Sequence, residues 1–138
     1  MSLKLLSFAW IVALGIVSPA RADSVPPTIL KHIKPFQIDS VGLASGTLRV
    51  VMRRPMVSDF MYHSVAINGI CTALFGEPNG WGNARIDRIE VLNDIGAQGF
   101  ALLDAKATCG RVGKLADVES KQAVAAQTVS CISGSCKR

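Results

Sequence analysis

The sequence predicts an α+β protein in which one main helix packs on a small antiparallel sheet of about four strands, with disulfides as staples. Three observations support this prediction. A helical pattern runs over residues 58–75, short stretches of alternating apolar and polar residues lie on both sides of it, and the chain has four cysteines.

Residues 1–22 have the features of a cleaved secretory signal peptide. Lys4 supplies the positive charge, residues 5–17 form an apolar run, and Ala-Arg-Ala at 20–22 is a small-x-small cleavage site. The alternative is a membrane anchor, but this run is shorter than the roughly 20 residues that span a bilayer. We therefore expect a periplasmic or secreted mature chain that starts at Asp23 and has no stable membrane insertion.

Residues 23–35 contain three prolines and no clear period, which predicts an extended N-terminal arm. Residues 36–138 are expected to form a single α+β domain. Its first strand begins at Phe36, a turn follows at 44–46, and a second strand covers 47–53. Alternation in the second strand places three apolar side chains on one face: Leu48, Val50 and Met52.

The central helix is expected over residues 58–75. Ser58 can cap its N-terminus, and Gly76 ends it. At 100° per residue, four side chains form a stripe that is expected to face the core: Phe60, Ile67, Cys71 and Leu74. Because Cys71 lies in this stripe, its thiol is expected to tether the helix to the sheet.

The second half of the chain starts with a loop at 76–83 that is rich in glycine. A strand at 85–93 and another at 100–103 are close enough to pair antiparallel, although the first also fits helical spacing. Residues 114–126 are ambiguous, and we expect a short helix or irregular segment followed by a strand that enters Cys131.

Four cysteines follow the leader, and an even number in an exported chain predicts two disulfides. Three pairings are possible. We favour Cys71–Cys109 with Cys131–Cys136, because the Ser-Gly-Ser between the last two cysteines can turn tightly. From chain entropy, a closed loop of about 39 residues contributes about 4 kcal/mol and one of about six residues contributes about 2 kcal/mol.

The charge of the chain gives no indication of a nucleic-acid partner. Outside the leader, thirteen basic residues are set against ten acidic ones, which gives a net charge of +3. The basic residues are scattered, apart from Arg53-Arg54 and Lys137-Arg138. Nucleic-acid binding normally requires a basic patch or stripe, so we expect no nucleic-acid partner.

No set of residues points to catalysis, a metal or a cofactor. His63 lies one helical turn after Asp59, a spacing that can tune a general base, but no nucleophile accompanies the pair. His32 has no ligand-like spacing to another residue. Cys131 and Cys136 have four residues between them, whereas redox motifs have two. We therefore assign no catalytic residue, no metal ligand and no cofactor.

The loop that leaves the central helix is the expected recognition surface. Its sequence, GEPNGWGN, sets a tryptophan between two glycines, which offers a large contact area on an adaptable backbone. The predicted partner-binding residues are Asn79, Gly80, Trp81 and Gly82. The alternative is that Trp81 folds back as a plug at the edge of the core.

These features predict a small exported, disulfide-stabilised and non-enzymatic protein that binds another macromolecule. The partner is expected to be an unknown protein or envelope component, and the role that of an accessory, inhibitor or immunity-type factor. The alternative is a small periplasmic enzyme, either a hydrolase that uses His63 or a thiol redox protein that uses Cys131 and Cys136.

Overall fold

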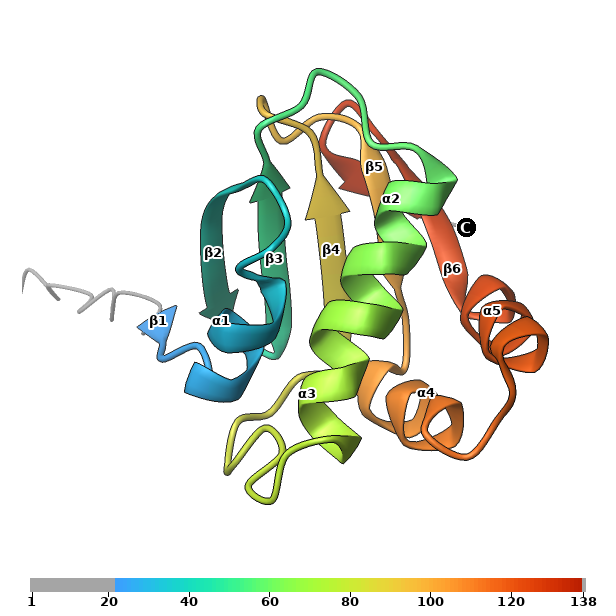
Figure 1. Cartoon of the computed structure of the whole chain (residues 1–138). Coiled ribbons are helices and arrows are strands. Elements are labelled where there is room, and N and C mark those ends of the chain that lie inside the picture. The colour runs from blue at the N-terminus through green and yellow to red at the C-terminus, as the bar shows by residue number, and fades with distance from the viewer. Residues whose placement is uncertain (1–21, 138) are drawn as a thin grey trace, which may run out of the picture.

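Within residues 22–137, the fold is a mixed seven-stranded sheet with four helices (Figure 1). The computed structural model describes residues 22–137, so the predicted leader lies outside the described residues except for Ala22. The strands follow chain order across the sheet, from β1 at one edge to β7 at the other. The prediction of one helix on a four-stranded antiparallel sheet is therefore wrong.

The strands are β1 (Ala22–Asp23), β2 (Ile38–Ala44), β3 (Thr47–Met52), β4 (Arg88–Leu92), β5 (Gly99–Leu102), β6 (Thr128–Ile132) and β7 (Ser135–Cys136). The helical segments are α1 (Pro27–Ile33), α2 (Asp59–His63), η1 (Ser64–Cys71), α3 (Thr72–Phe75), α4 (Ala105–Val112) and α5 (Asp117–Ala126). Segments α2, η1 and α3 follow one another without a break and form one central helix, of which η1 is π-helical.

Strands β3 and β4 are parallel, whereas all other neighbouring pairs in the described sheet are antiparallel. Parallel neighbours need a crossover, and the central helix supplies it. The register sets Leu48 beside Ile89 and Val50 beside Val91, so these four buried side chains share one face of the sheet. The central helix packs over this face.

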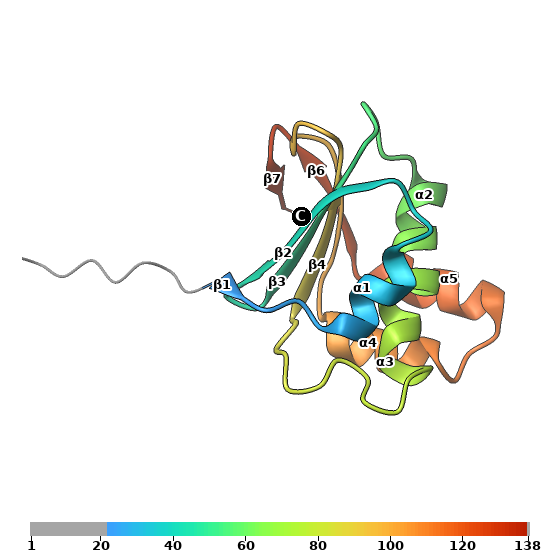
Figure 2. The same ribbon diagram turned by 60° about the vertical axis from the view of Figure 1, so that its left-hand side comes forward.

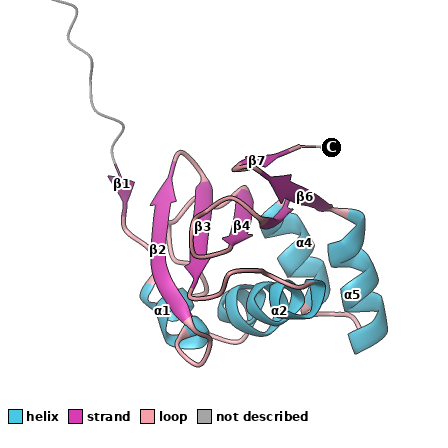
Figure 3. Ribbon diagram, turned by 90° about the horizontal axis from the view of Figure 1, so that it is seen from above, coloured by secondary structure: helices cyan, strands magenta, loops and turns pink. Residues whose placement is uncertain are grey.

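The helices all lie on one face of the sheet (Figures 2 and 3), and the main core fills the space between the two layers. The opposite face has no helix over it within residues 22–137. On that face Glu90 is only 6% exposed, and its carboxylate accepts hydrogen bonds from Arg49 Nε at 3.0 Å and Arg88 Nε at 2.9 Å. A buried charge is tolerated when it is paired in this way.

The N-terminal segment does not form the extended arm that was predicted for residues 23–35, because it contains helix α1. Pro27 is the first helical residue, a position where the missing N–H is not needed and the fixed φ favours the helix. Ile29 and Ile33 are buried in the main core. A Cβ added to Gly69 of the central helix would lie 3.1 Å from Ile33, so the two helices pack closely.

The central helix begins as predicted, since Ser58 Oγ accepts a hydrogen bond from the Met61 amide at 3.2 Å. Of the predicted apolar stripe, Cys71 is buried and Ile67 and Leu74 are partly buried against the core, but Phe60 is 79% exposed, so its place in the stripe is wrong. The buried residues of the central helix are Tyr62, Val65, Ala66, Gly69, Ile70, Cys71 and Ala73. The small side chains among them let α1 and the sheet pack closely against the central helix. In the π-helical turns the angle between successive side chains differs from the 100° of an α-helix.

Two further helices follow β5, and only one of them was expected. Helix α4 was not expected, since glycine disfavours the interior of a helix; Gly110 nevertheless lies within α4, and Gly113 caps its end. Helix α5 and strand β6 match the expected helix followed by a strand that enters Cys131. Both helices are short, so the helical spacing of their apolar residues repeats too few times to be recognised in the sequence.

Two disulfides, Cys71–Cys109 and Cys131–Cys136, are present in the described chain, and they have the favoured pairing. The first is fully buried and joins the central helix to α4, not to the sheet as was predicted. The second joins β6 to β7 across a short turn.

The two disulfides are expected to contribute unequally to stability. Replacing Cys71 and Cys109 together by alanine should lower the free energy of unfolding by about 4 kcal/mol, because the bridge closes a long loop. The matched replacement of Cys131 and Cys136 should cost about 2 kcal/mol, because the closed loop is short. Urea unfolding of both double variants measures the difference, and equal or reversed costs would contradict this assignment.

Candidate functional site

An open pocket of about 560 Å³ lies between the N-terminal segment and the loop that follows the central helix. One wall is formed by Asp23, Ser24 and the first residues of α1, and the other by residues 79–85. Leu43 of β2 also contributes. We call this feature the N-terminal pocket. It contains all four residues that were predicted to bind a partner: Asn79, Gly80, Trp81 and Gly82.

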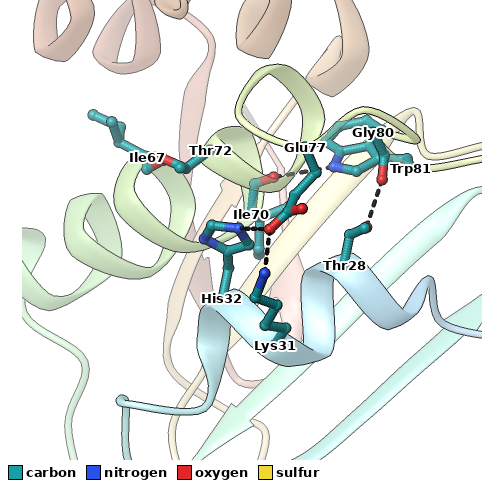
Figure 4. A network of polar contacts seen from close by, with 9 residues as sticks. All are labelled: Thr28, Lys31, His32, Ile67, Ile70, Thr72, Glu77, Gly80 and Trp81. Atoms are coloured by element: carbon teal, nitrogen blue, oxygen red, sulfur yellow. Dashed lines mark hydrogen bonds and ion pairs between the residues drawn. The ribbon is translucent and has the colours of Figure 1, made fainter.

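Trp81 borders this pocket but is only 3% exposed. Its indole Nε1 donates a hydrogen bond to the Ile70 carbonyl of the central helix at 3.0 Å (Figure 4). The ring therefore anchors the loop to the core, as in the alternative considered for it, and does not offer the large exposed aromatic contact that the sequence suggested. The exposed polar side chains of this wall are those of Asn79, Asn83 and Arg85.

The start of the loop is tied to α1 by Glu77 (Figure 4). Its Oε1 atom accepts a hydrogen bond from Lys31 Nζ at 2.7 Å and lies 2.9 Å from His32 Nε2. These bonds, first that of Lys31 and then that of His32, lower the pKa of the Glu77 carboxyl group below its usual value.

A second link joins the two walls of the pocket directly. The Thr28 hydroxyl donates a hydrogen bond to the Gly80 carbonyl, across 52 positions of sequence (Figure 4). Gly80 and Gly82 have φ values of +50° and +60°, which side chains with a Cβ rarely adopt. The loop is thus held by its backbone conformation, by Trp81 and by helix α1 together.

The charge of the pocket is nearly balanced. Asp23 and Arg85 are the charged residues that line it within the described chain. The Arg85 guanidinium is already paired, since its Nε lies 2.6 Å from Asp87 Oδ2. The pocket therefore lacks the excess of positive charge that a strongly anionic ligand would require.

Of the residues considered for catalysis, His63 and Asp59 lie side by side, and Cys131 and Cys136 are bonded to each other. His63 Nδ1 lies 3.2 Å from Asp59 Oδ2, but its buried Nε2 has no hydrogen-bond partner, and the nearby Ser64 hydroxyl donates to the Phe60 carbonyl. Cys131 and Cys136 are joined in a disulfide.

Within the part that the structure describes, no three metal-binding side chains come together, and no helix is long and apolar enough to cross a membrane.

Sequence reasoning found one wall of the N-terminal pocket and missed the other. Asp23, Ser24 and Thr28 belong to a segment that was expected to be an extended arm, so nothing placed them beside the loop. Pro27 was the one sign of helix α1 in the sequence, since proline is common in the first turn of a helix. Even so, pairing α1 with a loop some fifty positions away requires the tertiary fold.

Comparison of the chain with protein-family models, with curated proteins and with solved structures found no match. Its function is therefore inferred from the geometry of the described residues.

Glu77 is expected to make the protein less stable in acid. Because its pKa is lowered on folding, its contribution to stability is present above the pKa of an unfolded glutamate and is lost as the pH falls through the folded pKa. Glu77→Gln should therefore be less stable than the wild type at pH 7, and the difference should shrink as the pH falls below about 4.

Urea unfolding between pH 7 and pH 2 measures this effect. Glu119→Gln is the matched control, because Glu119 is an exposed glutamate on α5, away from the pocket. A constant difference between Glu77→Gln and the wild type over the whole pH range would show that the ion pairs with α1 do not stabilise the loop.

Proposed function

We propose that this chain is a small exported protein that binds another macromolecule through the N-terminal pocket. The observation that carries the proposal is the convergence of Asn79, Gly80, Trp81 and Gly82 with the N-terminal segment around one open pocket of about 560 Å³. Binding residues commonly lie on loops that a rigid scaffold positions, and this loop leaves the disulfide-anchored central helix.

The pocket is preorganised, which favours binding. Glu77 and Thr28 fix the loop to α1, and Trp81 fixes it to the central helix. A surface that is already ordered loses less conformational entropy when it binds a partner. Asn79 and Asn83 remain exposed on this ordered wall, so their amide groups are available to a ligand.

Export is part of the proposal. Two buried disulfides are compatible with an extracellular or periplasmic location, where such bonds persist. We propose cleavage after Ala22, which would make Asp23 the first residue of the mature chain and place its new amino group beside the N-terminal pocket.

A side chain added at Gly82 should weaken partner binding, because it would occupy part of the pocket. Gly82 lines the pocket, has a φ of +60°, and has no atom within 4 Å of the position a Cβ would take. Asparagine tolerates this backbone conformation better than most residues, so Gly82→Asn should fold and reduce recovery of the partner at least tenfold. The measurement is a quantitative pull-down from the native periplasm or culture medium.

Gly96→Asn is the matched control for this experiment. Gly96 has a φ of +69° and equally open surroundings, and it lies between β4 and β5, outside the pocket. It should therefore bear the same backbone strain and keep the partner. Equal recovery by both variants would overturn the N-terminal pocket as the binding site.

A further inference from the structure

We propose that a second pocket, between the end of β3 and the start of the central helix, binds the carboxy-terminal residue of a partner polypeptide that ends in a large apolar side chain. The pocket has a volume of about 260 Å³ and shares no lining residue with the N-terminal pocket. The inference therefore goes beyond the proposed function and does not depend on it. We call this feature the Phe60 groove, and its lining includes Phe36, Gln37, Met52, Arg54, Phe60 and Met61.

The backbone around the groove is held by hydrogen bonds between segments that are far apart in the sequence. The Arg53 amide donates to the Gln37 carbonyl at 2.9 Å, which joins the residue after β3 to the segment before β2. The Asp94 amide donates to the Arg54 carbonyl at 2.9 Å, which adds the turn after β4. Figure 1 shows that β3 ends and α2 begins at the same end of the sheet. A ligand therefore meets a preformed surface.

The lining of the groove is mainly apolar. Met52 is buried, and Phe36 and Met61 are partly buried against the main core. Phe60 differs from them, because its side chain is 79% exposed on the first turn of α2. An exposed aromatic ring beside an apolar hollow offers contact area that the described chain does not use, and methionine side chains adapt to apolar ligands of different shape. The groove therefore suits an apolar side chain.

The charge of the groove favours an anionic group on the ligand. Arg54 is the charged residue that lines it within the described chain. Arg54 is exposed and pairs with no carboxylate of residues 22–137, whereas Arg53 lies 3.6 Å from Asp39. Asp59 and Asp94 come from the adjoining segments and do not line the groove. A guanidinium binds a carboxylate through two parallel hydrogen bonds, so a carboxylate is complementary to this cation.

A carboxy-terminal residue carries the two required groups on one Cα atom, and capture of a terminal carboxylate is an established mode of peptide recognition. The volume of about 260 Å³ lies below the roughly 300–1,000 Å³ of pockets that enclose a drug-sized ligand, which favours one side chain over a long acyl chain. The exposed Gln37 amide also lines the groove, and its carbonyl can accept a hydrogen bond from the last N–H of the peptide.

The first experiment compares four probes on protein expressed from the full chain: N-acetyl-Ala-Ala-Phe as the free acid, its carboxamide, N-acetyl-Ala-Ala-Ala as the free acid, and octanoate. Affinities are measured by titration of amide chemical shifts. The free acid ending in phenylalanine should bind about tenfold more tightly than each of the others, because it alone combines the carboxylate with a bulky side chain on one Cα atom.

Each other outcome of this comparison overturns the inference. Equal binding of the acid and the carboxamide would show that no carboxylate is recognised. Equal binding of the two free acids would show that the apolar lining is not used, and tighter binding of octanoate would identify a fatty acid as the ligand. Absence of saturable binding by the free acid ending in phenylalanine would leave the groove without this function.

Arg54→Gln tests the cation. It should remove the preference for the free acid over the carboxamide, because the neutral amide of glutamine cannot replace the guanidinium charge. Arg53→Gln is the matched control, since Arg53 is the exposed neighbour that does not line the groove, and it should keep the preference. Equal effects of the two substitutions would overturn the pairing of Arg54 with the carboxylate.

Phe60→Ala tests the apolar wall. It should weaken binding of the free acid ending in phenylalanine about tenfold and leave the urea midpoint nearly unchanged, because the ring is exposed. Ile95→Ala is the matched control, since Ile95 is equally exposed and lies outside the groove, and it should bind as the wild type does. Wild-type affinity in Phe60→Ala would overturn the Phe60 groove as the site.

Gly82→Asn separates this site from the N-terminal pocket. Gly82 lines that pocket and not the Phe60 groove, so the variant should bind the free acid ending in phenylalanine as the wild type does. Loss of binding in Gly82→Asn would place the peptide in the N-terminal pocket and overturn the inference.

Discussion

The attachment of the central helix to its surroundings is the constraint on which the rest of the structure depends. The buried disulfide between Cys71 and Cys109 joins the helix to α4, and the small face around Gly69 lets α1 approach closely. The helix must also cross the sheet to make β3 and β4 parallel, so its position determines the order of the central strands. Covalent attachment, close packing and sheet topology thus all hold the same helix in place.

The pocket follows from this attachment. The loop that leaves the helix is held at the helix by Trp81 and at α1 by Glu77 and Thr28, so helix α1 and the loop form two walls at a fixed separation. Because α1 itself packs on the central helix, both walls share one support. The lining of the pocket is partly polar, and Asn79, Gly82 and Asn83 of the loop are exposed.

Local signals were sufficient to predict several elements. Alternation gave β3, capping by Ser58 gave the start of the central helix, and the short Ser-Gly-Ser turn indicated the bridge between Cys131 and Cys136. Angular arithmetic placed Cys71 in the core but misplaced Phe60, which is exposed, because the central helix contains a π-helical segment whose turns depart from 100° per residue. Helices α1 and α4 were missed because proline and glycine are read as breakers, although each also has a favoured place at or near a helix end.

The sequence by itself determined which segments are extended or helical wherever a single cap, turn or alternation decided the matter. It also favoured, among three possible pairings of the cysteines, the one that the structure has. Only the tertiary structure decided that the sheet is mixed, that Trp81 is buried, and that the residues after position 22 form the second wall of the pocket. The physical reason is the range of the interactions. Caps and turns act over a few residues, whereas the bond from Thr28 to Gly80 joins segments 52 positions apart, and no local preference encodes that contact.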